Sequence, residues 1–215
     1  PKDWQVFGDR ILTTDTLFEQ ATLPPRIAVI GLGAIGAEMA QALARLGLDV
    51  AGFGTSKTLA GLSDPEVAAS FHQLFAREVA CHLGAPATLA DTGNGILVEG
   101  ADGSFVADAV LAAMGRQPNV DGLGLDTLGV ELDERGMPPV DPTTMRIEDL
   151  PVYLAGDANG DLAILHEAAD EGHIAGRNAA SGRADNYCRR TPLGITFTSP
   201  GVARNGLMSS PPRRV

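Results

Sequence analysis

The sequence predicts an α/β fold with a parallel sheet, and three observations support this prediction. The apolar run RIAVIG at 26–31 is typical of a strand that is buried on both faces of such a sheet. A helical pattern follows directly over 34–46, and Gly47 stands where a helix C-terminal cap is expected. A second apolar run, DVAGF at 49–53, predicts the next strand. Together these segments predict a strand–turn–helix–strand unit of about 30 residues.

The turn of this unit is GLGAIG, which has the G-x-G-x-x-G spacing of dinucleotide-binding turns. We expect Gly31 to allow the tight turn, Gly33 to let the backbone approach a pyrophosphate, and Gly36 to let helix and strand pack closely. The helix start at Ala34 and Ile35 then offers free N–H groups to the phosphates. The motif predicts a Rossmann-type domain that binds a dinucleotide; a structural glycine turn in another α/β fold is the alternative.

The residues after the second strand leave the choice between NAD and NADP open. An acidic residue there would hydrogen-bond the ribose of NAD, and an arginine would favour the phosphate of NADP. The sequence has Gly54, Thr55, Ser56 and Lys57 instead. Lys57 could meet a 2′-phosphate, but a solvated loop lysine is the more ordinary interpretation.

Further elements follow the first unit. A helix is predicted at 64–79, with Asp64 as its cap and an apolar face of Val67, Phe71 and Leu74. The remaining predictions are hairpin strands and a buried strand within 96–115, loops over 115–142, a buried strand VYLAGD at 152–157, a helix at 163–181 with a face of small residues, and a strand-like piece GITFTS. That small-residue face should pack closely against another element, or stay exposed without one.

Composition excludes several classes of protein. The formal net charge is −11, and only Arg189–Arg190 and the tail PPRRV are basic, which argues against a nucleic-acid binder. The sequence contains no run of about 18 apolar residues, which is the length needed to span a membrane. The N-terminus does not follow the plan of a signal peptide. Cys81 and Cys188 lie far apart without metal-type spacing, so we expect neither a disulfide framework nor a metal site, and a cytoplasmic location.

Five segments in order resemble one family. They are GDRILTTDTLFE, PPRIAVIGLGAIGAEMA, AAMGRQPNVDGLGLDTLGVELDERG, VYLAGDANGDLAILHEAADEGHIAGRNAA and FTSPGVARNG. The chain resembles the flavin-dependent pyridine nucleotide–disulfide oxidoreductases, and most of all the dihydrolipoamide dehydrogenase branch. The resemblance implies a nicotinamide dinucleotide domain placed between two pieces of a Rossmann-like FAD-binding domain. Within the family, Gly36 rather than alanine favours NAD.

The resemblance also assigns roles to residues. Glu38 is similar to the residue that lies near the nicotinamide amide and the flavin edge. AMGRQPN, which contains Gly115, resembles the turn where the chain returns to the flavin domain, although Met114 replaces the usual threonine. Gly156 and Asp157 resemble the second flavin motif, whose carboxylate accepts a hydrogen bond from the ribityl chain.

The segment from Leu165 to Gly172 resembles the helix start that faces the flavin pyrimidine ring. Free N–H groups there would stabilise the negative charge of a reduced flavin. His166 is expected to act through its backbone rather than its imidazole. No catalytic residue is assigned.

The resemblance implies hydride transfer between NAD(P)H and FAD, coupled to a disulfide, in a complete and dimeric enzyme. The alternatives are a mercuric reductase, transhydrogenase or NADH oxidase, or a non-catalytic NAD(P)H-binding module. The family's first flavin motif and its C-x-x-x-x-C pair are missing, so we expect a fragment that is inactive alone. The expected division is a connector at 1–25, an NAD(P)-binding domain at 26–145, a second FAD-domain segment at 146–182, and the start of the interface domain or a tail at 183–215.

Overall fold

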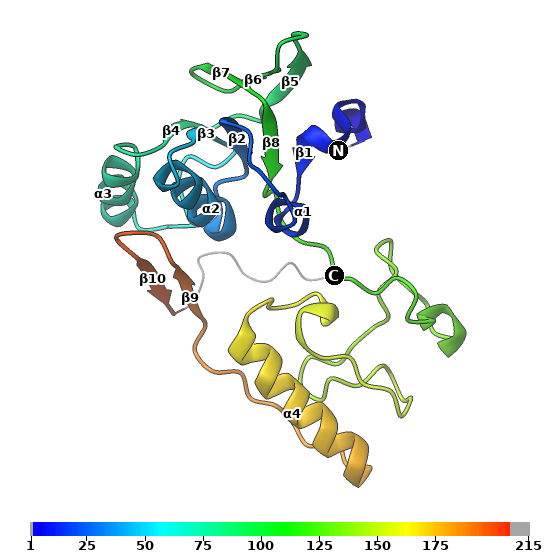
Figure 1. Ribbon diagram of the computed structural model, residues 1–215. Coiled ribbons are helices and arrows are strands. Elements are labelled where there is room, and N and C mark those ends of the chain that lie inside the picture. The colour runs from blue at the N-terminus through cyan, green and yellow to red at the C-terminus, as the bar shows by residue number, and fades with distance from the viewer. Residues whose placement is uncertain (1, 207–215) are drawn as a thin grey trace. The chain divides into compact units, whose positions relative to one another are not determined.

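The structure is a computed structural model that describes residues 2–206 (Figure 1). The chain forms two compact units. Within the described residues, the first unit contains 2–115 and 192–206, and the second contains Arg116–Thr191. The boundary expected at residue 145 therefore lies inside the second unit, and the assignment of segments to cofactor domains stays a prediction. No helix within 2–206 is long and apolar enough to cross a membrane.

A five-stranded parallel sheet forms the centre of the first unit, with the strand order β1-β8-β2-β3-β4. The sheet confirms the predicted α/β class and both predicted strands of the first βαβ unit. Residue Ile30 of β2 lies beside Phe53 of β3, so the glycine turn and the end of β3 share one sheet edge. The strands are β1 (Ile11–Leu12), β2 (Arg26–Ile30), β3 (Asp49–Gly54), β4 (Ala80–Leu83) and β8 (Ala109–Ala112).

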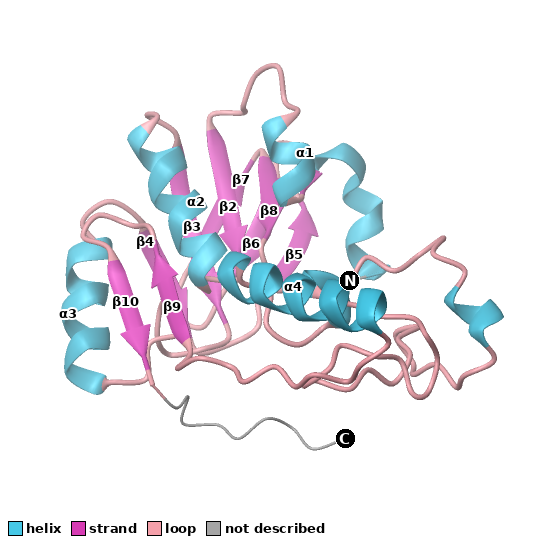
Figure 2. Cartoon of the chain, turned by 90° about the horizontal axis from the view of Figure 1, so that it is seen from below, coloured by secondary structure: helices cyan, strands magenta, loops and turns pink. Residues whose placement is uncertain are grey.

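Helices α1 (Thr14–Phe18), α2 (Ala34–Arg45) and α3 (Pro65–Phe75) supply apolar side chains to one core, packed on the sheet (Figure 2). The carboxylate of Asp64 caps α3 by accepting from the N–H groups of Glu66 and Val67, as the sequence predicts. The predicted apolar face of α3 is wrong in part. Val67 and Leu74 are 48% and 38% exposed, because the helix turns Phe75 inward against Phe71, with ring centroids 5.6 Å apart.

An antiparallel sheet covers the other face. It consists of β5 (Thr88–Asp91), β6 (Ile96–Glu99) and β7 (Ser104–Ala107), and its core includes Phe53 and Ile96. The predicted hairpin and the buried strand β8 are confirmed. Strands β4 and β5 are additions to the expected elements.

Residues 2–25 pack within the first unit. A 3₁₀ segment at Lys2–Arg10 places Phe7 in the core that contains Phe53 and Ile96, the second core of this unit. Leu12 of β1 is buried beside β8. Thr13 and Thr16 form a reciprocal capping box at the start of α1. The expected connector thus adds an edge strand to the parallel sheet.

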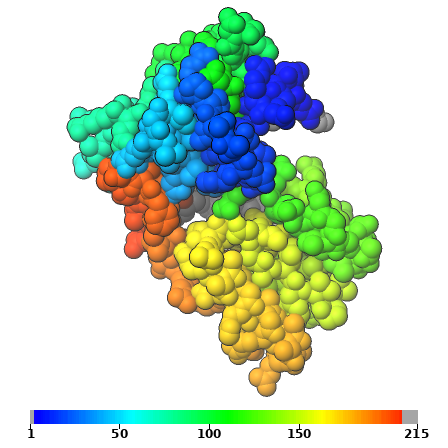
Figure 3. All heavy atoms as spheres, in the orientation of Figure 1, coloured from blue at the N-terminus to red at the C-terminus, as the bar shows by residue number. Residues whose placement is uncertain are grey.

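The C-terminal part of the first unit is a hairpin of β9 (Leu193–Thr196) and β10 (Val202–Asn205), which confirms the strand-like piece in the sequence. Figure 3 shows this orange segment resting on the blue and cyan atoms of the first unit. The side chain of Gln41 on α2 bonds both backbone groups of Ser199, at 2.7 and 3.0 Å. The hairpin is therefore fixed to the helix that begins at the glycine turn.

The second unit contains 3₁₀ turns at Leu125–Leu128 and Gly156–Asn159 and the helix α4 (Leu165–Ser181). The strand predicted at 152–157 is wrong: Tyr153 makes one isolated bridge, with Arg146, and the chain turns at Gly156, where φ is +74°. In the described part of this unit, no neighbouring strand extends that bridge into a ladder. The small residues of α4 are mostly exposed, namely Ala169, Gly172, Gly176 and Ala179.

Candidate dinucleotide-binding site

Two glycines of the turn are required by packing inside the protein. Gly31 has φ +96°, and a Cβ there would lie 2.4 Å from the carbonyl oxygen of Ala113. A Cβ on Gly36 would lie 1.7 Å from the carbonyl oxygen of Gly31. The segment after β8 therefore leaves no room for a side chain at Gly31, and the close approach of α2 to the turn leaves none at Gly36.

Gly33 is different, because the surrounding protein leaves room for a side chain. A Cβ there would meet no described atom within 4 Å, and its φ of −66° suits any residue. An open, exposed glycine between two packed ones would let a phosphate group approach the protein backbone closely. The turn thus fits a dinucleotide pyrophosphate on its own geometry.

The N-terminus of α2 starts in this turn. Gly33 is the N-cap, its carbonyl accepts from the N–H of Ala37 at 3.0 Å, and among the described residues no side chain caps the helix. Ala34 and Ile35 are the first helical residues and are half-buried. The first amides of the helix, with its partial positive charge, are left for a ligand or water.

The end of β3 carries no ribose-binding acid. Gly54 is buried, and its carbonyl accepts from the N–H of Gly84 at 2.8 Å. Lys57 is exposed in the loop that follows, and Asp49 lies at the opposite end of the strand. The structure therefore adds no signal that separates NAD from NADP.

Glu38 lies about one turn along α2 from the glycine turn. Its Oε1 accepts a hydrogen bond from the N–H of Phe197 at 2.8 Å. Further along α2, the side chain of Gln41 accepts from the N–H of Ser199. Two side chains of α2 therefore hold the loop after β9. Sequence reasoning missed this contact, because it joins residues 159 positions apart.

Gly115 closes the first unit. The preceding N–H of Ala113 bonds the carbonyl oxygen of Ile30 at 2.8 Å, which places this segment against the glycine turn. Gly115 itself has φ +115° and open space around it. Its left-handed backbone marks the point where the chain leaves the first unit.

The predicted flavin residues lie in the second unit. Gly156 is buried, and a Cβ there would lie 3.3 Å from the Cβ of Ala168 on α4. Asp157 is exposed and pairs with Arg116, whose Nη1 lies 2.9 Å from Oδ2. Arg116 also donates to the carbonyl oxygen of Ala163 at 3.0 Å. The arginine of the G-R-x-P-N segment thus ties together the turn and the approach to α4, a role that its motif did not predict.

The start of α4 has a free N-terminus. No described side chain caps it at Ile164, Leu165 is 88% exposed, and the side chain of His166 is 44% exposed. The exposed positions fit a helix start that receives a ligand. Neither side chain is enclosed, which agrees with a role for the backbone.

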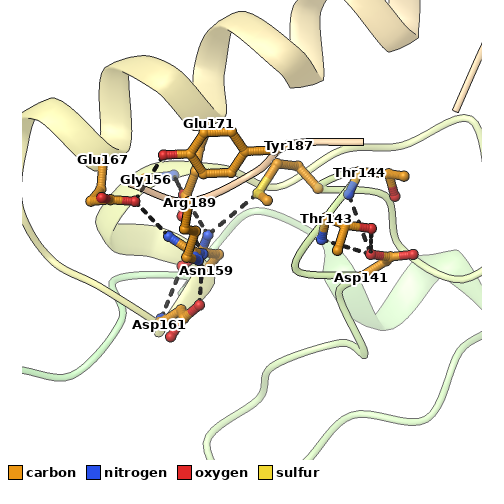
Figure 4. A network of polar contacts seen from close by, with 11 residues as sticks. Asp141, Thr143, Thr144, Gly156, Asn159, Asp161, Glu167, Glu171, Tyr187 and Arg189 are labelled. Atoms are coloured by element: carbon orange, nitrogen blue, oxygen red, sulfur yellow. Dashed lines mark hydrogen bonds and ion pairs between the residues drawn. The ribbon is translucent and has the colours of Figure 1, made fainter. Parts of the chain in front are cut away.

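A buried polar network lies beneath the Gly156 turn (Figure 4). Glu167 and Glu171 of α4 are 1% and 0% exposed. Their partners come from the turn and from the segment after the helix, including Tyr187 and Arg189. Sequence reasoning missed the network; the available signal was the four-residue spacing of the two acids on one helix face.

The structure groups the predicted site residues by unit. Those of the nicotinamide site are contiguous in the first unit, with Gly115 following the segment that packs on Gly31. Those of the flavin half-site gather around the Gly156 turn and the start of α4 in the second unit. Each group is formed locally within its own unit, and their cofactor roles stay predictions.

Comparison with known proteins gives one consistent answer. A family model described as pyridine nucleotide-disulphide oxidoreductase matches residues 2–172. Dihydrolipoyl dehydrogenase of Chlamydia muridarum is 32% identical over 92% of this chain and 43% of its own length. Mercuric reductase of Streptomyces lividans is 34% identical over 91% of this chain and 42% of its own length.

A solved structure agrees with these relatives. The crystal structure of LpdA from Mycobacterium tuberculosis matches with a TM-score of 0.77 and 32% identity, over 91% of this chain and 43% of that one. The chain spans less than half the length of these relatives. Since the family model covers most of the sequence and the fold agrees, the chain belongs to the pyridine nucleotide-disulphide oxidoreductase family.

Proposed function

We propose that this chain provides the NAD(P)-binding part and one half of the flavin site of a disulfide oxidoreductase of the dihydrolipoyl dehydrogenase type. The observation that carries the proposal is the open space at Gly33, between two glycines that internal packing requires. In the complete enzyme, NAD(P)H would supply a hydride and FAD would accept it. A dimeric, cytoplasmic enzyme is part of the same proposal.

The chain's own residues would bind and orient the two cofactors. The turn at Gly33 and the start of α2 would hold the pyrophosphate through backbone N–H groups and the helix dipole. Glu38 would accept from the nicotinamide amide. Asp157 would accept from the ribityl chain, and the amides at Leu165 would stabilise negative charge on the flavin ring.

A mercuric reductase activity is the second candidate, favoured by the 34% identity to the Streptomyces relative. A non-catalytic NAD(P)H-binding module is the candidate from another class. In the sequence of a longer protein, a C-x-x-x-x-C motif before this segment would support an enzyme of this family over the non-catalytic module.

Calorimetric titration with NADH tests the nicotinamide site. Gly33→Val places a branched side chain in the open space and should abolish the binding heat. Gly172→Val is the matched control, because Gly172 is exposed on α4 and a Cβ there also meets nothing within 4 Å. Equal NADH affinity for wild type and Gly33→Val would place the site elsewhere.

The same titration with NADPH tests cofactor choice. We expect similar affinities for the two cofactors, with a slight preference for NADH. Gly54→Glu should increase this preference through hydrogen bonds to the ribose hydroxyls. The new Cβ would lie 3.2 Å from Cδ2 of Leu83, a flexible side-chain end that can move. A more than tenfold preference of the wild type for NADPH, about 1.4 kcal/mol, would contradict this expectation.

A further inference from the structure

Three carboxylates converge on one guanidinium beneath the Gly156 turn (Figure 4). Arg189 Nη1 lies 2.8 Å from Glu167 Oε2. Its Nη2 lies 2.7 Å from Glu171 Oε1 and 2.6 Å from Asp161 Oδ2. Arg189 follows α4 in the sequence, so the segment after the helix returns to hold the turn before it.

The second oxygen of Glu171 holds the turn directly. Its Oε2 accepts from the N–H of Gly156 at 2.8 Å and from Nδ2 of Asn159 at 2.6 Å. These two bonds clamp both ends of the 3₁₀ turn that carries Asp157. The orientation of Asp157 therefore depends on the carboxylate of Glu171.

Arg189 is the cation paired with this buried carboxylate. Glu167 and Glu171 are almost wholly buried, and burying a carboxylate without a paired charge is costly. Hydrogen bonds to an ionised acceptor are about twice as strong as neutral ones. Loss of Arg189 would thus weaken the clamp on Gly156 without touching the turn itself.

We propose that Arg189 is a positioning residue of the flavin half-site, which acts through Glu171 to fix the turn that presents Asp157. The inference rests on the proposed function. It also assigns residue 189, expected in an interface domain or tail, to the flavin-binding part of the chain.

The test uses the full 215-residue chain, labelled with ¹⁵N, as wild type, Arg189→Met and Arg190→Met. Arg190 is the matched control, because its side chain is 73% exposed and pairs with Asp170 at the surface. The first readout is hydrogen exchange at the Gly156 amide, compared with amides of the first unit. The second is the shift of the Asp157 amide during titration with FAD.

Arg189→Met should speed exchange at Gly156 and weaken FAD binding, each by about tenfold or more, because the carboxylate that holds Gly156 loses its paired charge. Arg190→Met should change neither. Unchanged exchange and FAD shifts in Arg189→Met would overturn the role of Arg189 and leave the flavin site standing. No FAD shift in the wild type would overturn the flavin site, and the role of Arg189 with it.

A second variant covers loss of folding. If Arg189→Met unfolds the second unit, Arg189→Lys keeps a positive charge but cannot present a planar fork to three carboxylates. The inference then requires faster exchange at Gly156 in a folded Arg189→Lys chain. Exchange equal to that of the wild type would contradict it.

Discussion

Replacing Gly36 by alanine should destabilise the first unit, because α2 touches the glycine turn at this point. The new Cβ would lie 1.7 Å from the carbonyl oxygen of Gly31 and 3.3 Å from the Cβ of Ala113. Ordinary contacts between carbon atoms are about 3.5–4.0 Å. The start of the helix must therefore move away from the sheet by more than about 1 Å.

The magnitude follows from two opposing effects. Overpacking of this kind costs about 1–3 kcal/mol, and a clash with backbone belongs at the upper end. Alanine in a helix interior gains about 1 kcal/mol over glycine. We expect a net loss of about 2 kcal/mol in the free energy of unfolding, or about 6 °C in Tm for a unit of this size.

Urea unfolding followed by tryptophan fluorescence measures this loss. Trp4 is the protein's single tryptophan and packs against the second core of the first unit, so its emission reports on that unit. Gly33→Ala is the control; its Cβ meets no described atom within 4 Å, and the change should stay below about 1 kcal/mol. A Gly36→Ala chain as stable as the wild type, or equal losses in both variants, would refute the packing argument.

Three further predictions concern other parts of the chain. Burial raises the pKa of the Cys81 thiol to about 12. At pH 8 a thiol reagent should therefore label the exposed Cys188 quickly and Cys81 only on unfolding. Rapid labelling of both cysteines in the folded protein would contradict this. Burial, and then the hydrogen bond to Glu167, raise the pKa of Tyr187 from 10.0 to about 12, so its contribution to stability is complete below pH 10 and is lost as pH rises toward 12. Tyr187→Phe should remove that part of the alkaline loss in urea titrations, and an unchanged pH profile would count against it. Asp64→Ala removes the cap of α3 and should lower the free energy of unfolding by about 1 kcal/mol, whereas Asp64→Asn should lower it much less.

The unit from β2 to β3 could be predicted because its signals are local. A short apolar run, a glycine turn and a helical period each fix the backbone within a few residues. Even the separate reasons for Gly31 and Gly36 follow from the motif, since close packing of helix and turn is part of its geometry. The loop contact between Glu38 and Phe197 could not be predicted, because nothing local to either residue indicates the other.

The segment VYLAGD shows why a buried strand is a weaker prediction. Its apolar residues favour an extended chain, but a strand also needs a neighbour along its length. Here Tyr153 bridges only to Arg146 within the described part of the second unit, and Gly156 then turns the chain. The local sequence pattern therefore indicates an extended backbone, but it cannot show whether a neighbouring strand is present.

The exposed small residues of α4 agree with one of the two expectations from the sequence, but the buried face of two acids could not be predicted, and charge explains why. Small residues predict a face that another element approaches, whereas Glu167 and Glu171 look like solvated acids of a polar helix. The structure buries the acids instead, because Arg189 forms ion pairs with both of them and the N–H of Gly156 donates to Glu171. An acid face becomes a core face only when the fold brings it a cation and backbone donors. Since Arg189 lies 18 residues beyond Glu171 and across a turn, only the three-dimensional structure reveals that pairing.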